Sequence, residues 1–160
     1  MKPPQIEKGS KFPTEFALGS FSHRDVAVIR KITRESLGEN YPPSLFIDIN
    51  GWWPDGFIVV RGEDAIIAFI AGVVSAPRQA RVLMLAVRKD YRNRGIGSAL
   101  MAEFTKRCIA RGITSIELEV RKSNAGAIKF YNRLGYSIRH LLPRFYTDKE
   151  DGYKMYKDIR

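Results

Sequence analysis

Hydrophobic and polar residues repeat with a helical period in the first third of this chain. Apolar side chains recur every three or four positions across residues 23–37, which predicts a helix. These positions are Val26, Ile29, Ile32, Thr33 and Leu37. Ser22, with Asp25 three residues later, matches the capping pattern of a helix start. Gly38 and the following Pro42-Pro43 pair end the helix.

The rest of the chain alternates between short strand patterns and further helical patterns. The predicted strands cover residues 15–19, 56–61, 65–75, 80–88, 116–120, 136–142 and 153–157, and the predicted helices cover 23–37, 44–49, 95–111 and 124–134. Consecutive strands in the middle imply antiparallel pairing, and the later strand–helix–strand segments imply parallel pairing. The sequence therefore predicts an α/β (α+β) fold: one domain over residues 15–160 with a mixed, mostly antiparallel central sheet and helices on both faces. Residues 1–14 are rich in Pro, Lys and Gly, and we expect a flexible N-terminal extension there.

Composition and charge limit the classes of function. A chain of 160 residues with 44% apolar residues can bury a core without disulfide bonds, and a single Cys excludes a cysteine-cluster metal site. His23 and His140 are isolated, so we expect no metal centre. No apolar run is long enough for a membrane span, and the N-terminus lacks a signal-peptide core, so we expect a cytoplasmic protein. The net charge of +10 implies an anionic partner such as nucleic acid, a ribosome, a membrane surface or a polyphosphate cofactor.

A glycine-containing segment after the strand at 80–88 is the most informative motif. Its residues are Arg92, Asn93, Arg94, Gly95, Ile96, Gly97 and Ser98. The two glycines let successive N–H groups point into one concavity, the following helix start adds further N–H groups, and the arginines add charge. This predicts a phosphate or pyrophosphate site, with an incidental glycine pair at a helix start as the alternative. A Walker loop is excluded because Gly-Lys-Ser/Thr is absent, and the dinucleotide fingerprint lacks its third glycine, where Leu100 stands.

Several motifs in this order resemble those of one enzyme family. The pattern Arg92-x-x-Gly95-x-Gly97 resembles the acetyl-CoA signature of the GNAT acetyltransferase superfamily, and Leu85-Ala86-Val87 resembles the family strand that receives the pantetheine arm. Residues 118–131 resemble the second half of N-terminal acetyltransferases of the RimI and Ard types, and residues 143–153 resemble the Ard-type ending. The resemblance implies acetyl-CoA as cofactor and acetyl transfer to the α-amino group of protein or peptide N-termini.

Glu119 is the candidate general base. In the strand at 116–120 the apolar residues face one way, whereas Glu117, Glu119 and Arg121 face the other. A charged row on a sheet that helices cover on both faces is costly, so its presence predicts a water-filled cleft on that side. A solvated or salt-bridged strand face is the alternative. RimI-type enzymes use a glutamate at this motif position as a base, and the resemblance implies the same role here.

Tyr131 is the candidate acid, and Asn124 begins its helix. The resemblance places Tyr131 near the sulfur of CoA, where a phenol can protonate the leaving thiolate; an aromatic side chain packed in the core is the alternative. Asn124 caps the helix, bonds the pantetheine, or does both.

The acceptor side is predicted from two loops and one strand. Glu39, in a loop after the first helix, binds an incoming ammonium or acts as a second base in Ard-type enzymes, with a surface charge as the alternative. Tyr41, Phe145 and Tyr146 are expected to line the peptide slot. Arg81 stands where water-relay enzymes of the family carry a Tyr, and Glu119 where they carry a His, so this chain resembles a carboxylate variant. We expect Arg81 to affect which peptide termini fit.

Other functions stay open from the sequence. The same chemistry applies to a lysine side chain, a polyamine or an antibiotic amine, because the superfamily is diverse. A non-catalytic acyl-CoA sensor that binds RNA or a ribosome is a different class, favoured only by the positive charge. Ribosome association is also an open accessory property of the enzyme, which we expect to be a monomer or a homodimer.

Overall fold

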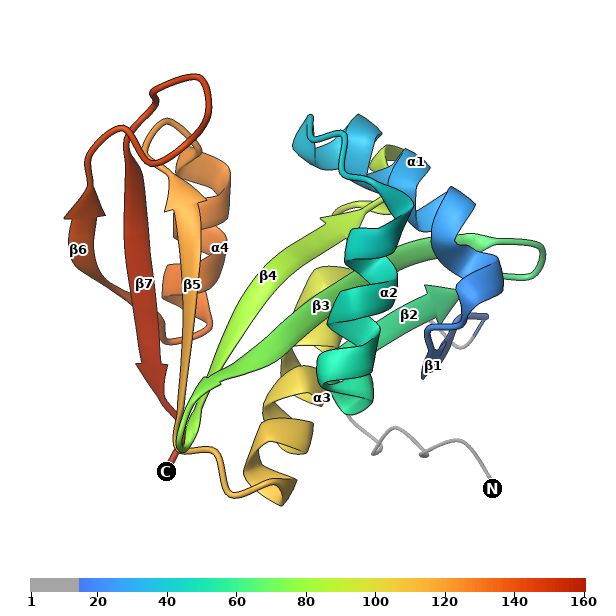
Figure 1. Ribbon diagram of the computed structural model, residues 1–160, viewed down its shortest axis with the longest axis horizontal. Helices are drawn as coiled ribbons and strands as arrows, with labels where there is room; N and C mark the ends of the chain where they lie inside the picture. The colour runs from blue at the N-terminus through green and yellow to red at the C-terminus, as the bar shows by residue number, and fades with distance from the viewer. Residues whose placement is uncertain (1–14) are drawn as a thin grey trace.

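The computed structural model describes residues 15–160, so the extension expected at residues 1–14 lies outside the described residues. Its strands are β1 (Ala17–Ser20), β2 (Phe57–Arg61), β3 (Ile66–Ala76), β4 (Gln79–Val87), β5 (Ser115–Arg121), β6 (Ser137–Leu142) and β7 (Gly152–Asp158) (Figure 1). Its helices are α1 (Val26–Leu37), α2 (Pro43–Trp52), α3 (Ile96–Ala110) and α4 (Ala125–Arg133), with short 3-10 turns η1 (His23–Asp25), η2 (Pro54–Gly56) and η3 (Lys89–Tyr91). The predicted elements are all present, each shifted by a few residues at most.

The strands form one sheet in the order β1-β2-β3-β4-β5-β7-β6. Only β4 and β5 are parallel neighbours, and every other pair is antiparallel. The strand–helix–strand pattern predicted parallel pairing for both later units. That expectation holds for β4 and β5 but is wrong for β5 and β6, because β7 lies between them. A helical crossover fixes strand direction but leaves room for a third strand to insert.

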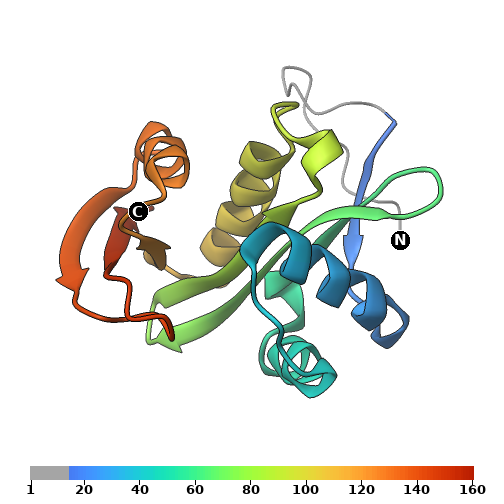
Figure 2. The same ribbon diagram turned by 90° about the horizontal axis from the view of Figure 1, so that it is seen from above.

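Helices cover both faces of this sheet, as the hydrophobic pattern predicts. Helices α1 and α2 lie on one face, and α3 and α4 lie on the other (Figure 2). Each face has its own apolar cluster: Ile29, Phe46, Phe57 and Phe69 belong to the first, and Leu100, Phe104, Cys108 and Leu118 belong to the second. Cys108 is fully buried, and this burial raises its pKa to about 12, so its thiol is a core group. The described part of the chain contains no helix with the length and apolar character needed to cross a membrane.

The capping box that the sequence predicts forms between Ser22 and Asp25, and it caps the 3-10 turn η1, which leads directly into α1. The Ser22 N–H donates to Asp25 Oδ2 at 2.8 Å, and Arg61 on β2 donates to both oxygens of the same carboxylate at 3.1 and 2.8 Å. Burial alone opposes ionisation of Asp25, but these hydrogen bonds outweigh it, and the pKa of Asp25 lies below its ordinary value. At the other end, Gly38 adopts φ 69°, a left-handed conformation that ends the helix.

We expect Asp25→Asn to destabilise the fold by about 1–2 kcal/mol at pH 7, because an amide accepts fewer charge-assisted hydrogen bonds than a carboxylate. A carboxyl whose pKa is lowered on folding stabilises the native state above its unfolded pKa, near 3.9, and loses that contribution as the pH falls toward the folded value. Urea unfolding of both proteins at pH 7 and pH 3 measures this. The difference should shrink at pH 3; an equal difference at both pH values would contradict the ion pair.

Candidate active site

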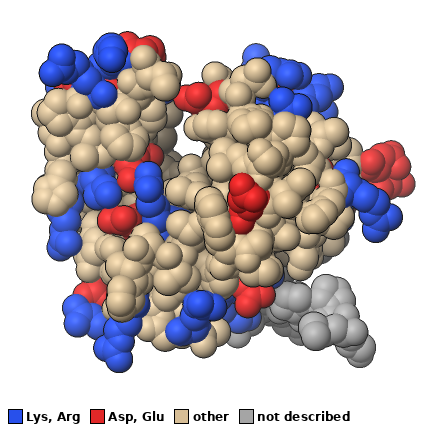
Figure 3. All heavy atoms as spheres, viewed as in Figure 1, with Lys and Arg blue, Asp and Glu red and all other residues tan. Residues whose placement is uncertain are grey.

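A cavity opens where β4 and β5 stop pairing. Their parallel pairing covers only Gln79–Val82 and Ser115–Leu118, and beyond it the strands diverge (Figure 1). A notch between the two halves of the molecule is visible at the diverging end (Figure 3). The cavity between the strands has a volume of about 410 Å³. It is lined by Ser36, Leu37, Glu39, Tyr41, Val82, Leu83, Met84, Leu85, Leu118, Glu119, Val120, Arg121, Asn124, Ala127, Tyr131 and Tyr146.

The predicted phosphate loop lies between β4 and α3 and has the backbone of an anion site. Asn93 (φ 63°) and Gly95 (φ 79°) both adopt left-handed conformations, and α3 begins at the next residue, Ile96. The Ile96 side chain is buried in the core, so only its backbone can face an anion. The first N–H groups of a helix have no partner within it, which leaves those of the first turn, including Gly97 and Ser98, for a ligand.

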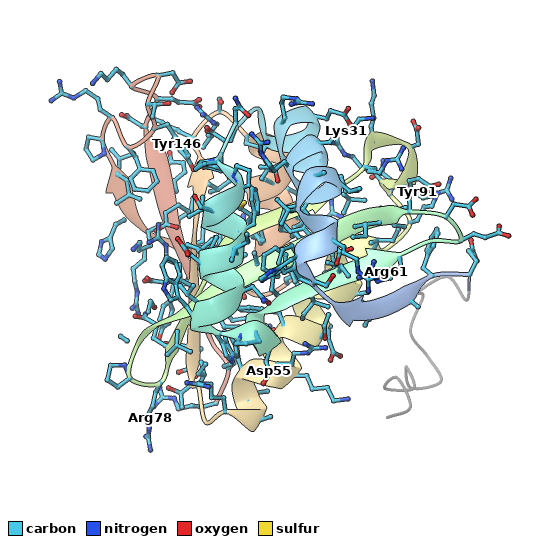
Figure 4. The ribbon with its side chains drawn as sticks, turned by 45° about the vertical axis from the view of Figure 1, so that its right-hand side comes forward. Lys31, Asp55, Arg61, Arg78, Tyr91 and Tyr146 are labelled. Atoms are coloured by element: carbon cyan, nitrogen blue, oxygen red, sulfur yellow. The ribbon has the colours of Figure 1, made fainter. Side chains whose placement is uncertain are left out.

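The two arginines of this loop are held by the backbone around them. Arg92 Nε donates to the Val87 carbonyl at 3.0 Å, and Arg94 Nη2 donates to the Asp90 carbonyl at 3.2 Å. The Arg94 guanidinium also lies 5.3 Å from the ring centre of Tyr91. Tyr91 and Tyr146 lie on opposite sides of the molecule (Figure 4). The cavity lining includes Tyr146 but none of residues 92–98, so the phosphate loop lies outside the cavity.

The predicted pantetheine strand fits an extended amide-containing ligand. Leu85 lines the cavity, and Ala86 is buried against the opposite face. Because β5 has left β4 at this point, no strand within residues 15–160 pairs with the β4 edge from Leu83 onward on the cavity side, although the Val87 carbonyl at its end accepts a hydrogen bond from Arg92. Such an edge can exchange backbone hydrogen bonds with the amides of a ligand.

We expect Gly97→Val to weaken acetyl-CoA binding by about 10- to 100-fold, because the branched side chain would displace the first turn of α3, whose N–H groups would bind the phosphates. A Cβ at Gly97 would lie 3.4 Å from Phe130 on α4, so the two further methyl groups of valine would crowd the gap between α3 and α4. Gly51→Val on α2 is the control, since a Cβ there meets nothing within 4 Å. Calorimetric titration with acetyl-CoA measures both, and equal affinity for the two variants would contradict the loop assignment.

Glu119 lies at the inner wall of the cavity, with its side chain only 9% exposed. The alternation predicted for its strand is confirmed, since Ile116, Leu118 and Val120 are buried on the other face. Arg81 lies outside the cavity lining, and its Nε is 3.0 Å from the Glu119 carboxylate. The structure thus brings Arg81 against the candidate base.

Tyr131 and Asn124 both reach the cavity from α4. Asn124 caps this helix, because its Oδ1 accepts a hydrogen bond from the Ala127 N–H at 3.1 Å. Tyr131 packs edge-on against Phe130 and Tyr136. Burial raises the pKa of the Tyr131 hydroxyl above its ordinary value, and the neighbouring Tyr146 adds to the shift. The hydroxyl therefore keeps its proton at physiological pH and can donate it.

Two loops frame the cavity mouth, and Arg121 on β5 joins them. Its guanidinium lies 3.4 Å from Glu39 in the loop before α2 and 2.9 Å from both Asp148 and Glu150 in the loop before β7. It also stacks 4.1 Å from the ring centre of Tyr146. The hydrogen bonds from Arg121 and from Ser123 help to lower the pKa of Glu150, so its carboxylate stays ionised. The Arg121 side chain thus connects the two loops that form the cavity mouth.

Among the residues expected in the acceptor slot, the structure brings together some and not others. Glu39, Tyr41 and Tyr146 line the cavity, whereas Phe145 lies outside the lining, 44% exposed, and packs edge-on against Tyr146. Burial raises the pKa of Tyr146 to about 12, with opposing effects from Arg121 and Glu119. Arg121 was not predicted as a site residue. The signal was present, since it shares a strand face with Glu119, but its loop partners are 27 to 82 residues away in sequence.

Residues 15–160 contain no group of three or more His, Cys, Asp or Glu side chains that could hold a metal ion. The lining of the cavity presents the carboxylates of Glu39 and Glu119, the guanidinium of Arg121 and the hydroxyls of Tyr41, Tyr131 and Tyr146.

Comparison with known proteins agrees with this fold. Residues 26–136 match the Acetyltransferase (GNAT) family. The chain is 35% identical over 138 residues to an uncharacterised N-acetyltransferase of Methanocaldococcus jannaschii, covering 86% of this chain and 88% of that protein. It is 30% identical over 153 residues to an N-alpha-acetyltransferase of Sulfurisphaera tokodaii, covering 88% and 92%. The crystal structure of Ard1 from Thermoplasma volcanium superposes with a TM-score of 0.89 at 33% identity, covering 92% and 99%.

The chain belongs to the GNAT acetyltransferase family. Acetyl-CoA is the cofactor of this family, and the backbone cradle at Asn93–Ser98 and the free edge of β4 fit its phosphate and amide groups. The resemblance inferred from the sequence motifs is confirmed at this level, as is the fold class.

Proposed function

We propose that this protein transfers the acetyl group of acetyl-CoA to the α-amino group of protein N-termini. The observation that carries the proposal is that Glu119 and Tyr131, on different elements, line one cavity at the divergence of β4 and β5. The relatives named N-alpha-acetyltransferase support the choice of acceptor.

The residues that would hold acetyl-CoA are those of the phosphate loop and of the β4 edge. Backbone N–H groups from Asn93 to Ser98, with the charges of Arg92 and Arg94, would bind the pyrophosphate. Leu85, Ala86 and Val87 would offer backbone groups to the pantetheine, and Asn124 lines the cavity at the start of α4. When bound, acetyl-CoA supplies a thioester carbonyl that an amine can attack.

The acceptor must lose a proton before or as its nitrogen attacks. An α-amine, with a reference pKa of about 7.7–8.0, is roughly 10–20% neutral at pH 7, whereas a lysine amine near 10.4 is only about 0.04% neutral. A general base therefore has a much smaller pKa difference to overcome with an α-amine than with a lysine amine. Glu119 would accept this proton, and Glu39 at the mouth would attract the incoming ammonium or act as a second base.

Tyr131 would complete the transfer. As the nitrogen–carbon bond forms and the carbon–sulfur bond breaks, the electron pair stays on sulfur, and the Tyr131 hydroxyl would donate a proton there. Its raised pKa keeps this proton available. Tyr41 and Tyr146 would contact the first residues of the peptide, since both line the cavity next to the bridged loops.

Two matched peptides test the acceptor. One has a free α-amine and no lysine, and the other has a blocked α-amine and one internal lysine. We expect the wild-type enzyme to acetylate only the first, as followed by mass spectrometry with acetyl-CoA as donor. Acetylation of the second alone would assign a lysine or small-amine acceptor, and acetyl-CoA binding without transfer to either would favour an acyl-CoA sensor.

A further inference from the structure

The side chain of Arg81 engages both oxygens of the candidate base. Its Nε lies 3.0 Å from Glu119 Oε2 and 3.0 Å from Oε1. Arg81 pairs across the sheet with Glu117, so it reaches past the last pair, Val82 with Leu118, to meet Glu119 two residues further along β5. The Glu119 side chain is 9% exposed and that of Arg81 is 36% exposed, so solvent reaches the arginine but barely reaches the carboxylate.

The other polar groups facing Glu119 come from every neighbouring element. Lys154 on β7 lies 3.4 Å from Glu119 and 3.5 Å from Glu117. Gln79 on β4 donates to Glu117 at 3.4 Å. Tyr146, in the loop between β6 and β7, is close enough for the Glu119 charge to affect its pKa. The network thus holds two cations and two carboxylates, and basic and acidic side chains interleave on this side of the molecule in Figure 3.

Two residues beyond Glu119, on the same face of β5, Arg121 has a different charge balance at the cavity mouth. There its single guanidinium contacts three carboxylates, those of Glu39, Asp148 and Glu150. This group carries an excess of negative charge, which suits the attraction of an ammonium group. Around Glu119 two cations contact two carboxylates, so the orientation of the Glu119 carboxylate depends on Arg81 and Lys154.

We propose that Arg81 is a positioning residue of the acetyl-transfer site: it fixes both oxygens of the Glu119 carboxylate at the cavity wall. The proposal rests on the proposed function, in which Glu119 accepts the proton of the acceptor amine. It assigns Arg81 a role through Glu119 and not, as its place in the sequence predicts, through contact with the peptide.

The test reads the surroundings of the Glu119 carboxylate directly, in protein labelled with ¹³C at the glutamate carboxyl carbons. The Glu119 signal is the one lost in Glu119→Gln, and its chemical shift is recorded by NMR at pH 7. In Arg81→Gln we expect this signal to move from its wild-type position, because the carboxylate loses the donor that contacts both of its oxygens. Arg81→Lys should recover part of the change. Arg107→Gln, which breaks a partly exposed ion pair on α3, is the control and should leave the Glu119 signal unmoved.

The same variants are then assayed for acetyl transfer at pH 7. We expect Arg81→Gln to lower kcat by about 10-fold or more, because a misplaced base loses its alignment with the acceptor amine, while the peptide KM stays unchanged. Arg81→Lys should recover part of the lost kcat. An unmoved Glu119 signal in Arg81→Gln would overturn the proposal, and so would an unchanged kcat accompanied by a changed peptide KM. Because the NMR measurement needs no acceptor, it tests the role of Arg81 even if the α-amine proves to be the wrong substrate.

Discussion

Glu119→Gln is expected to lower kcat at pH 7 by about 100-fold or more, since a positioned general base contributes about 10²–10⁴-fold. The amide keeps the size of the side chain and can still accept a hydrogen bond from Arg81, but it cannot take up a proton. The loss should lessen toward pH 9, where most α-amine is already neutral. Steady-state kinetics from pH 6 to 9, with acetyl-CoA affinity measured by calorimetry, give both quantities.

Glu117→Gln is the matched control for this variant. Glu117 lies on the same strand face, two residues away, and contacts Lys154 and Gln79, but it does not line the cavity. Its loss should change kcat by less than about fivefold, because a partly exposed ion pair is worth no more than about 1 kcal/mol. A wild-type pH–rate profile in Glu119→Gln would remove Glu119 as the base and leave Glu39 as the candidate.

Tyr131→Phe is expected to lower kcat by about 100-fold while acetyl-CoA binds as before, because the ring packing is kept and only the donated proton is lost. Since the pKa of Tyr131 is raised by burial, the wild-type enzyme should show no alkaline limb from this group below pH 10. Single-turnover measurements separate this effect from product release.

The neighbouring Tyr136 gives a close control for the lost hydroxyl. Its ring centre is 5.8 Å from that of Tyr131, yet its hydroxyl is buried with no hydrogen-bond partner within the described chain and lies outside the cavity lining. Tyr136→Phe should leave kcat unchanged and should not lower stability, because it removes an unsatisfied buried polar group. Equal losses of kcat in both variants would show that packing, not the proton of Tyr131, matters.

Local patterns account for most of the fold. The first helix, with its Ser22 cap and its Gly38 end, is determined by residues close in sequence, and so its limits could be predicted. The insertion of β7 between β5 and β6 could not, because it depends on which strands meet in space. Alternation identifies a strand and its buried face but gives no information about its neighbours.

The same division holds for the site. Glu119 and Tyr131 were predicted from one continuous motif, and the structure brings both to one cavity. The arginines that contact the two glutamates of the site come from distant segments. Arg81 is 38 residues from Glu119, and Arg121 is 82 residues from Glu39. Each is an arginine in a strand, a position that the sequence alone cannot separate from a solvated face. Their roles depend on the divergence of β4 and β5, which is a property of the whole sheet.

Competition within one substrate tests the central claim most directly. A peptide with both a free α-amine and an internal lysine is incubated with enzyme and acetyl-CoA at pH 7, and fragmentation mass spectrometry locates the first acetyl group. Because both amines are present at the same concentration, the ratio of products reports the preference of the site alone. We predict acetylation of the α-nitrogen only, with the lysine unmodified until the terminus is consumed. Acetyl groups on the lysine while the terminus stays free would contradict the assignment.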